Sequence, residues 1–280
     1  MDGPTSDPGN TGVAVAAGDD KTAAALAAAV DRRLARCVRL ASGELPPGAV
    51  VHGVRKDLKR VRALLRLATD AGAIAGSHEK ACAGIARKLS LRRDADAVLE
   101  ALDRLADRAG EPADLARVVE ARQLLEGYPA ADNDPVSFDA RALRRDLMSI
   151  RRSVAALDLS TLEAGRIGDA LALTHATARR QARRLGKEGH AKRFHALRKS
   201  VKRELHQREW LTRRVPGSGG GRKSLKQLAT LLGENQDIAV LKSFLRREGL
   251  YRGRLKRLVK AERDRVRAGA LRIAGTFYAD

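Results

Sequence analysis

The chain has 280 residues, with 55 Lys or Arg against 34 Asp or Glu, which gives a formal net charge of +21. A chain of this length with 44 % hydrophobic residues can bury a substantial core, which excludes wholesale disorder. Two Cys without a C-x-x-C pair exclude a disulfide framework and a thiolate zinc site. Because only 3 % of residues are aromatic and most apolar residues are Ala and Leu, the composition predicts an all-α fold.

The first segment of the chain, 1–20, is rich in Gly, Pro, Asp and Thr and has no periodicity. We interpret it as a disordered arm that precedes a helical domain over 21–280. Its acidic residues do not suit a signal peptide, and no apolar run approaches the roughly 18 residues that a membrane span needs. We therefore expect a cytoplasmic protein without a membrane partner.

Gly and Pro clusters divide the rest of the chain into helical segments, because these residues interrupt or end helices. The pattern predicts nine helices, at 22–42, 49–71, 77–109, 112–126, 136–157, 161–187, 190–214, 222–248 and 251–276.

A nine-residue motif occurs twice in the chain. The pattern H-x-x-R-K-x-x-K-R starts at His52 and again at His195, an offset of 195 − 52 = 143 residues. Asp94 and Asp237 are separated by the same offset, since 237 − 94 = 143, and apolar residues agree in the same register. The sequence therefore predicts an internal duplication. Its expected parts are a first half at about 21–135, a linking helix at about 136–157 and a second half at about 161–280.

The first copy of the motif has two distinct faces when it is placed on a helix. At about 100° per residue, six basic residues lie within an arc of about 120°, and the apolar residues Val51, Val54, Leu58, Val61 and Leu65 lie opposite. The six are His52, Arg55, Lys56, Lys59, Arg62 and Arg66. The charged ridge runs for roughly 21 Å and contains no acid, whereas ordinary surface helices alternate Glu with Lys. We interpret it as an anion-binding surface; the alternative is a solvated charged face.

The second copy begins with the same residues as the first and then diverges, because Glu204 and Glu209 enter the helix. We expect its ridge to be shorter. Further basic stripes at helical spacing are expected to line a basin where the two halves meet. With the end of the first ridge, this secondary lining comprises Arg32, Arg36, Arg39, Arg62, Arg66, Arg179 and Arg183.

The excess of positive charge predicts a polyanionic partner, which can be nucleic acid, an anionic membrane or polymeric phosphate. Aromatic residues are too few to stack the bases of a single strand, which favours polymeric phosphate. Sequence-independent binding of nucleic acid through its phosphates is the alternative. His52 and His195 are candidate phosphate ligands, and a capping or core-edge hydrogen bond is their other interpretation. Neither has a partner at metal-ligand spacing, so no metal or cofactor is expected.

The two motif segments, the R-D-x-D pattern within 89–99 and the segment 232–241 resemble the CHAD family, the "conserved histidine α-helical domain", over about 21–278. The resemblance implies two similar helical bundles related by pseudo-twofold symmetry, with basic residues facing a central cleft or pore. It also implies binding of inorganic polyphosphate and targeting to polyphosphate granules, whose associated proteins are further expected partners. The implied binding residues are His52, Arg55, Lys56, Lys59, Arg60, His195, Arg198, Lys199, Lys202 and Arg203.

An enzyme is the less favoured interpretation. A phosphohydrolase or phosphotransferase would use His52 or His195 as a base or phosphoryl carrier, but no carboxylate set for a divalent metal accompanies either residue. We interpret Asp94 and Asp237 as helix caps or as carboxylates that orient a buried Arg. The expected protein therefore binds its partner and has no catalytic residues.

Overall fold

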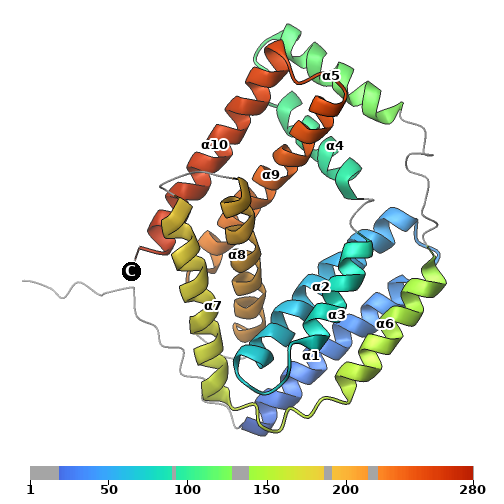
Figure 1. Cartoon of the computed structure of the whole chain (residues 1–280), viewed down its shortest axis with the longest axis vertical. Coiled ribbons are helices and arrows are strands. Elements are labelled where there is room, and N and C mark those ends of the chain that lie inside the picture. The colour runs from blue at the N-terminus through green and yellow to red at the C-terminus, as the bar shows by residue number, and fades with distance from the viewer. Residues whose placement is uncertain (1–18, 90–92, 128–138, 186–190, 214–219, 280) are drawn as a thin grey trace, which may run out of the picture.

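The computed structural model describes residues 19–89, 93–127, 139–185, 191–213 and 220–279, and these residues form α-helices without strands (Figure 1). The predicted all-α fold is therefore confirmed. The helices are α1 (Asp19–Leu40), α2 (Pro47–Asp70), α3 (Ser77–Lys88), α4 (Arg93–Ala106), α5 (Pro112–Glu126), α6 (Ala140–Ala155), α7 (Ala164–Leu185), α8 (Ala191–Leu211), α9 (Arg222–Arg247) and α10 (Gly253–Phe277).

The prediction of one continuous helix over 77–109 is wrong, because the structure has two helices in this segment, α3 and α4. Ser90 and Asp94 belong to the residue types that bond to nearby backbone and favour helix starts over helix interiors. Residues 90–92, which come between α3 and α4 in the sequence, lie outside the described part of the chain. So does the predicted arm, except for 19–20, with which α1 begins.

Two pairs of helices start at positions that differ by nearly the 143-residue offset of the motif. The starts of α2 and α8 differ by 191 − 47 = 144 residues, and the starts of α5 and α10 differ by 253 − 112 = 141. This agreement accords with the predicted duplication. The duplication, its twofold axis and the central cleft stay predictions.

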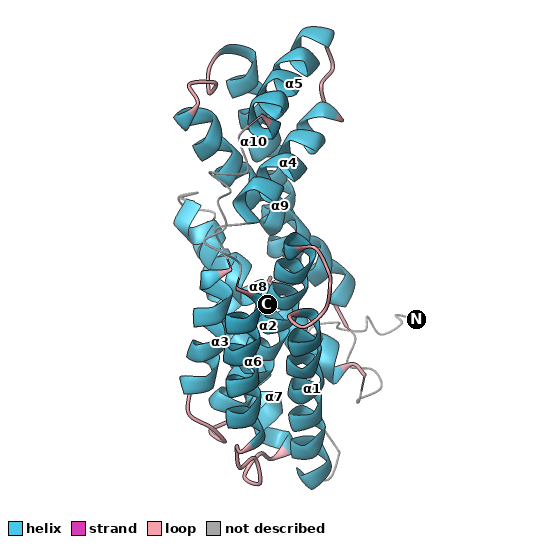
Figure 2. Ribbon diagram, turned by 90° about the vertical axis from the view of Figure 1, so that its right-hand side faces the viewer, coloured by secondary structure: helices cyan, strands magenta, loops and turns pink. Residues whose placement is uncertain are grey.

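Three hydrophobic clusters hold the helices together. The first joins α1, α2, α3 and α6 to the beginning of α7 and the end of α8. The second joins α4 and α5 to the C-terminal half of α9 and the N-terminal half of α10. The third joins α7 and α8 to the other halves of α9 and α10. Figures 1 and 2 show the second cluster's helices at one end of the long axis and α1, α2, α3 and α6 toward the other.

The apolar stripe predicted for the first motif helix is the buried face of α2. Val54, Leu58 and Val61 are each 0 % exposed, and they pack in the first cluster. Burial of one such side chain is worth about 1.5–3 kcal/mol. This face fixes the rotation of α2, so the motif cations on the opposite side are directed away from the core.

One glycine is required by the geometry at the start of α9. Gly221 caps this helix with φ +70°, a backbone conformation that other residues rarely adopt. A Cβ atom there would lie 2.4 Å from Cε2 of Phe277 in α10. The glycine thus lets the ends of α9 and α10 approach closely.

Candidate anion-binding site

The two motif helices, α2 and α8, pack directly against each other. The amide Nε2 of Gln207 in α8 donates to the backbone oxygen of Ala63 in α2 over 3.1 Å, and this hydrogen bond is buried. Nearby, Nε of Arg60 lies 3.9 Å from Oε2 of Glu209. Residues 143 or more positions apart in sequence are therefore neighbours, and the two motif copies belong to one region of the molecule.

Three of the predicted binding residues are exposed: His52 and Lys56 on α2, and Lys199 on α8. None of the three forms an ion pair with a carboxylate in the part of the chain that the structure describes. Their side chains are therefore accessible to an anion from solution.

Other motif residues are half-buried and held by neighbouring helices. Nη1 of Arg55 donates to the backbone oxygen of Ala86 in α3 over 2.7 Å. Nδ1 of His195 lies 2.9 Å from Oε1 of Gln236 in α9, which is a hydrogen bond at the edge of the core. These contacts fix where the two side chains lie. The remaining half-buried cations of the motif are Lys59, Arg60, Arg198, Lys202 and Arg203.

The far end of the first ridge is partly neutralised, although its own sequence over 52–66 carries no acid but Asp57. Nη2 of Arg62 lies 3.2 Å from Oε1 of Glu79 in α3, and Nη1 of Arg66 lies 3.9 Å from the other oxygen of Glu79. Arg66 also pairs with Asp70, one turn further along α2, over 2.8 Å. The expected secondary lining by Arg62 and Arg66 thus lacks the full charge that the sequence predicts.

Arg203 brings the second half of the chain to this same cluster. Burial lowers the pKa of Arg203, Glu79 raises it and Arg66 lowers it further, so the charge of this α8 residue interacts with charged side chains of α2 and α3. Arg203 itself forms no ion pair with a described carboxylate. A motif cation of α8 is therefore within electrostatic range of the end of the ridge on α2.

Sequence reasoning missed a buried carboxylate within the first motif. Asp57 is 0 % exposed, and its oxygens lie 3.0 Å from Nη1 of Arg33, 2.7 Å from Nη1 of Arg36 and 3.7 Å from Nη1 of Arg60. Arg36 and Arg60, which were expected to line the site, therefore share their charge with Asp57. A signal was present, because Asp57 lies at about 140° from His52, next to the apolar stripe. An acid there requires a cationic partner.

The other predicted lining residues are dispersed over two helices. Arg32 and Arg39 are exposed on α1, and Arg179 is half-buried on α7. Arg183 is exposed, and its Nη2 lies 3.4 Å from the backbone oxygen of Ala279 near the C-terminal end. Within the described part of the chain, none of these four residues forms a hydrogen bond or ion pair with α2 or α8, and their place in a common basin stays a prediction.

Glu204, which was expected to shorten the second ridge, lies inside the molecule. Its carboxylate is 0 % exposed and accepts hydrogen bonds from Nδ1 of His175 (2.9 Å), Nε of Arg208 (2.9 Å) and the hydroxyl of Tyr278 (2.7 Å). Burial alone would raise the pKa of Glu204, but the bonds from His175 and Tyr278 and the charge of Arg208 hold it below its usual value. Glu204 therefore anchors α8 and does not reduce the charge of its exposed face.

Asp237 has the structural role that the sequence favours. Its Oδ2 lies 3.4 Å from Nη2 of Arg104 in α4, so the carboxylate orients a half-buried arginine. The side chain of Asp94 lies outside the described residues.

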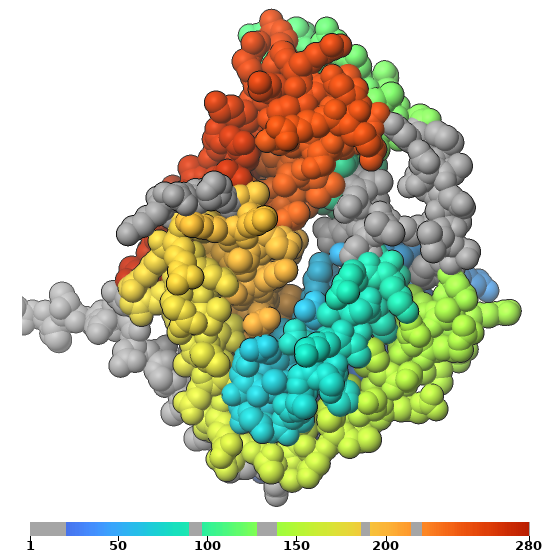
Figure 3. Space-filling view, viewed as in Figure 1, coloured from blue at the N-terminus to red at the C-terminus, as the bar shows by residue number. Residues whose placement is uncertain are grey.

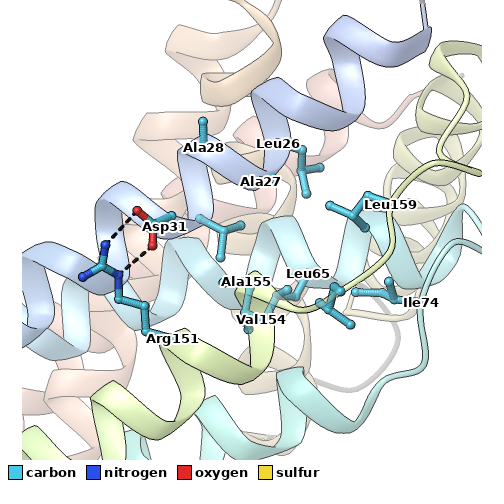
Figure 4. Close-up of a pocket in the computed structure, with 12 residues that line it drawn as sticks. Leu26, Ala27, Ala28, Asp31, Leu65, Ile74, Arg151, Val154, Ala155 and Leu159 are labelled. Carbon is cyan, nitrogen blue, oxygen red and sulfur yellow. Dashed lines mark hydrogen bonds and ion pairs between the residues drawn. The ribbon is translucent and has the colours of Figure 1, made fainter.

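A cavity of about 240 Å³ lies between α1, α2, α6 and the segment that follows α6, and none of the motif cations lines it (Figure 4). Its lining is mostly apolar and includes Leu26, Leu65 and Val154. Its charged lining residues, Asp31 and Arg151, pair with each other over 2.6 Å. This cavity does not suit an anion.

A family model of the CHAD domain matches residues 24–246. The chain belongs to the CHAD domain family. The CHAD region includes both motif helices and ends one residue before the end of α9, so α10 lies beyond it. No curated protein and no solved structure matches the chain. None of the described helices combines the length and apolar character that a bilayer span requires. The described residues also contain no group of three or more His, Cys, Asp or Glu able to hold a metal ion.

Proposed function

We propose that this CHAD protein binds inorganic polyphosphate through the face that α2 and α8 share. The observation that carries the proposal is the direct packing of two helices with the same motif, each with an exposed lysine at the same motif position. The CHAD domain is associated with polyphosphate binding, which supports this choice among polyanions.

The chemistry of polyphosphate suits this surface. The polymer is a chain of phosphates without bases, so its recognition needs cations in a row and no stacking platform. Lys56 and Lys199 are exposed point charges, and the half-buried Arg203 offers a guanidinium for two parallel hydrogen bonds to one phosphate. The net charge of +21 adds long-range attraction.

We propose that the protein acts by binding alone and that binding targets it to polyphosphate granules. Incubation with polyphosphate and Mg²⁺ should then release no phosphate beyond the rate without protein. Sustained release would identify an enzyme instead.

The first test reverses the charge of the two exposed motif lysines, Lys56 and Lys199. In Lys56→Glu/Lys199→Glu, attraction becomes repulsion at both motif copies, and we expect affinity for long-chain polyphosphate to fall about tenfold or more in calorimetric titration. Circular dichroism should show unchanged helicity, because both side chains are exposed. Unchanged affinity would show that another face binds the polymer.

The matched control is Lys21→Glu/Lys226→Glu, which reverses the charge of two exposed lysines outside the motif helices. Both double variants lower the net charge from +21 to +17, since 21 − 4 = 17. The control should lose much less affinity. An equal loss would mean that overall charge, and not the motif face, determines binding.

Competition with duplex DNA at matched phosphate concentration separates the proposal from its alternative. A polyphosphate-binding protein should prefer polyphosphate at physiological ionic strength. Preference for DNA would indicate a nucleic-acid-binding protein that reads phosphates without sequence.

A further inference from the structure

A second group of cations lies between α9 and α10, outside the motif helices. Nζ of Lys242 and Cζ of Arg246, one turn apart on α9, lie 5.4 Å and 5.3 Å from the centre of the same Tyr251 ring. Burial lowers the pKa of Lys242, and the charges of its cationic neighbours on both helices lower it further. We call this group the α9–α10 cluster; it comprises Lys242, Arg246, Lys256, Arg263 and Arg267.

The cluster adjoins the second motif through Arg267. Nε of Arg267 donates to Oδ1 of Asn235 over 2.9 Å, and its Cζ lies 4.7 Å from the centre of the Phe194 ring. The next residues in each helix, His195 and Gln236, form the contact described above. Arg267 and His195 therefore contact successive residues of α9. Lys242 lies six residues beyond Gln236, about 9 Å along the helix axis.

The carboxylates of α9 and α10 are mostly engaged elsewhere. Arg265 pairs with Glu262 over 2.8 Å and with Glu234 over 3.7 Å. Asp237 faces Arg104 of α4. Among the described residues, Lys242, Arg246 and Lys256 form no ion pair with a carboxylate, and Arg263 pairs with Asp264 over 2.8 Å. The positive charges of Lys242, Arg246 and Lys256 therefore repel one another, and a bound anion would remove that cost.

We propose that the α9–α10 cluster is a second anion-binding site, which takes phosphate groups of the same polyphosphate chain that the motif helices bind. This inference rests on the proposed function. The polymer would pass from the α2–α8 face over His195 to Arg267 and Lys242. The α9–α10 pair forms a continuous exposed surface in Figure 3, where it is coloured orange to red.

The site is particular to the second half of the chain. At the offset of 143 residues, Lys242 corresponds to Leu99 (242 − 143 = 99) and Arg246 to Asp103 (246 − 143 = 103). The duplicated motif therefore does not include it. Its α10 residues also lie beyond the segment that the family model matches. The polymer would consequently be held asymmetrically, with more contacts on the second half.

The test compares two double variants on α9. Lys242→Gln/Arg246→Gln removes two charges from the cluster, and Arg222→Gln/Lys226→Gln removes two exposed charges with the same spacing near the start of the helix. We expect the cluster variant to bind long-chain polyphosphate about three- to tenfold more weakly in calorimetric titration, and the control to stay within about twofold. Arg246→Gln alone, at an exposed position, should show part of the loss without any effect on folding.

A second measurement reads the cluster separately from the motif helices. Tripolyphosphate is titrated into Lys56→Glu/Lys199→Glu, and backbone amide signals are followed by nuclear magnetic resonance. Signals of Lys242 and Arg246 should shift and saturate, and the shifts should vanish in the protein that also carries the two cluster substitutions.

The outcomes for the two proposals differ. If Lys242→Gln/Arg246→Gln binds long chains like the wild type while Lys56→Glu/Lys199→Glu loses binding, the second site is refuted and the proposed function stands. If the cluster variant loses binding and the motif variant does not, the cluster binds anions and the proposed α2–α8 face is wrong. If neither substitution changes polyphosphate affinity, both proposals are overturned.

Discussion

At the scale of single residues, Asp57 determines how much charge the first motif presents. The sequence shows Arg36 and Arg60 as cations at helical spacing, and both were expected to contact the ligand. In the structure they surround a buried carboxylate together with Arg33. Helical periodicity places a residue on a face, but it does not show which side chain from another helix will approach. The exposure of Lys56 and Lys199 could be predicted, and the sharing of Arg36 and Arg60 could not.

The predicted consequence concerns stability. Asp57→Asn removes the negative charge from the centre of three guanidinium groups and leaves them to repel one another. We expect the free energy of unfolding at pH 7, measured with denaturant, to fall by about 3 kcal/mol. Asp107→Asn, at an exposed position, should change it by less than about 0.5 kcal/mol. Similar losses in the two variants would contradict a special role for Asp57.

At the scale of elements, α8 is held in place by Glu204. Its carboxylate connects His175 of α7, Arg208 of α8 and Tyr278 just after α10. The sequence predicts α8 and its apolar face from local periodicity. It presents Glu204 only as an acid that interrupts a basic ridge, because two of its three partners, His175 and Tyr278, are 29 and 74 residues away along the chain. The same limit applies to Glu79, which reaches the first ridge from α3.

Glu204 also predicts a pH dependence. The pKa of Glu204 is lowered in the folded protein. Its carboxylate therefore stabilises the fold above pH 4.5, the ordinary pKa of a glutamate, and this stabilisation is lost as the pH falls through the lowered pKa. Glu204→Gln should therefore unfold at pH 7 with a free energy about 3 kcal/mol lower than the wild type. The difference should narrow as the pH falls below 4.5, as measured by denaturant unfolding at each pH. A gap that stays constant down to strongly acidic pH would show that packing, and not charge, accounts for the loss.

At the scale of the whole molecule, the long helices connect the three hydrophobic clusters. α9 and α10 belong to the second and third clusters, and α7 and α8 connect the third to the first. The sequence predicts these helices and nearly all of their bounds. It does not predict which halves of α9 and α10 enter which cluster, because that depends on packing between distant segments.

Shared helices predict cooperative unfolding. Trp210 is the only tryptophan of the chain and is buried in the first cluster, whereas circular dichroism reports on all helices. Because no cluster is self-contained, we expect the fluorescence and dichroism transitions in denaturant to coincide. An earlier fluorescence transition would show that the first cluster unfolds independently.

The location of α4 and α5 has a practical consequence for dissecting the protein. Both helices precede α6 in sequence, yet they bury Leu102, Leu105 and Val118 against α9 and α10. If the chain were divided between the two motif copies, at residue 135 for example, and the two fragments were separated, these side chains would become exposed to solvent. The surfaces of α9 and α10 that they contact would become exposed as well. The boundary suggested by sequence repetition is thus a poor place to split the gene into fragments for separate expression.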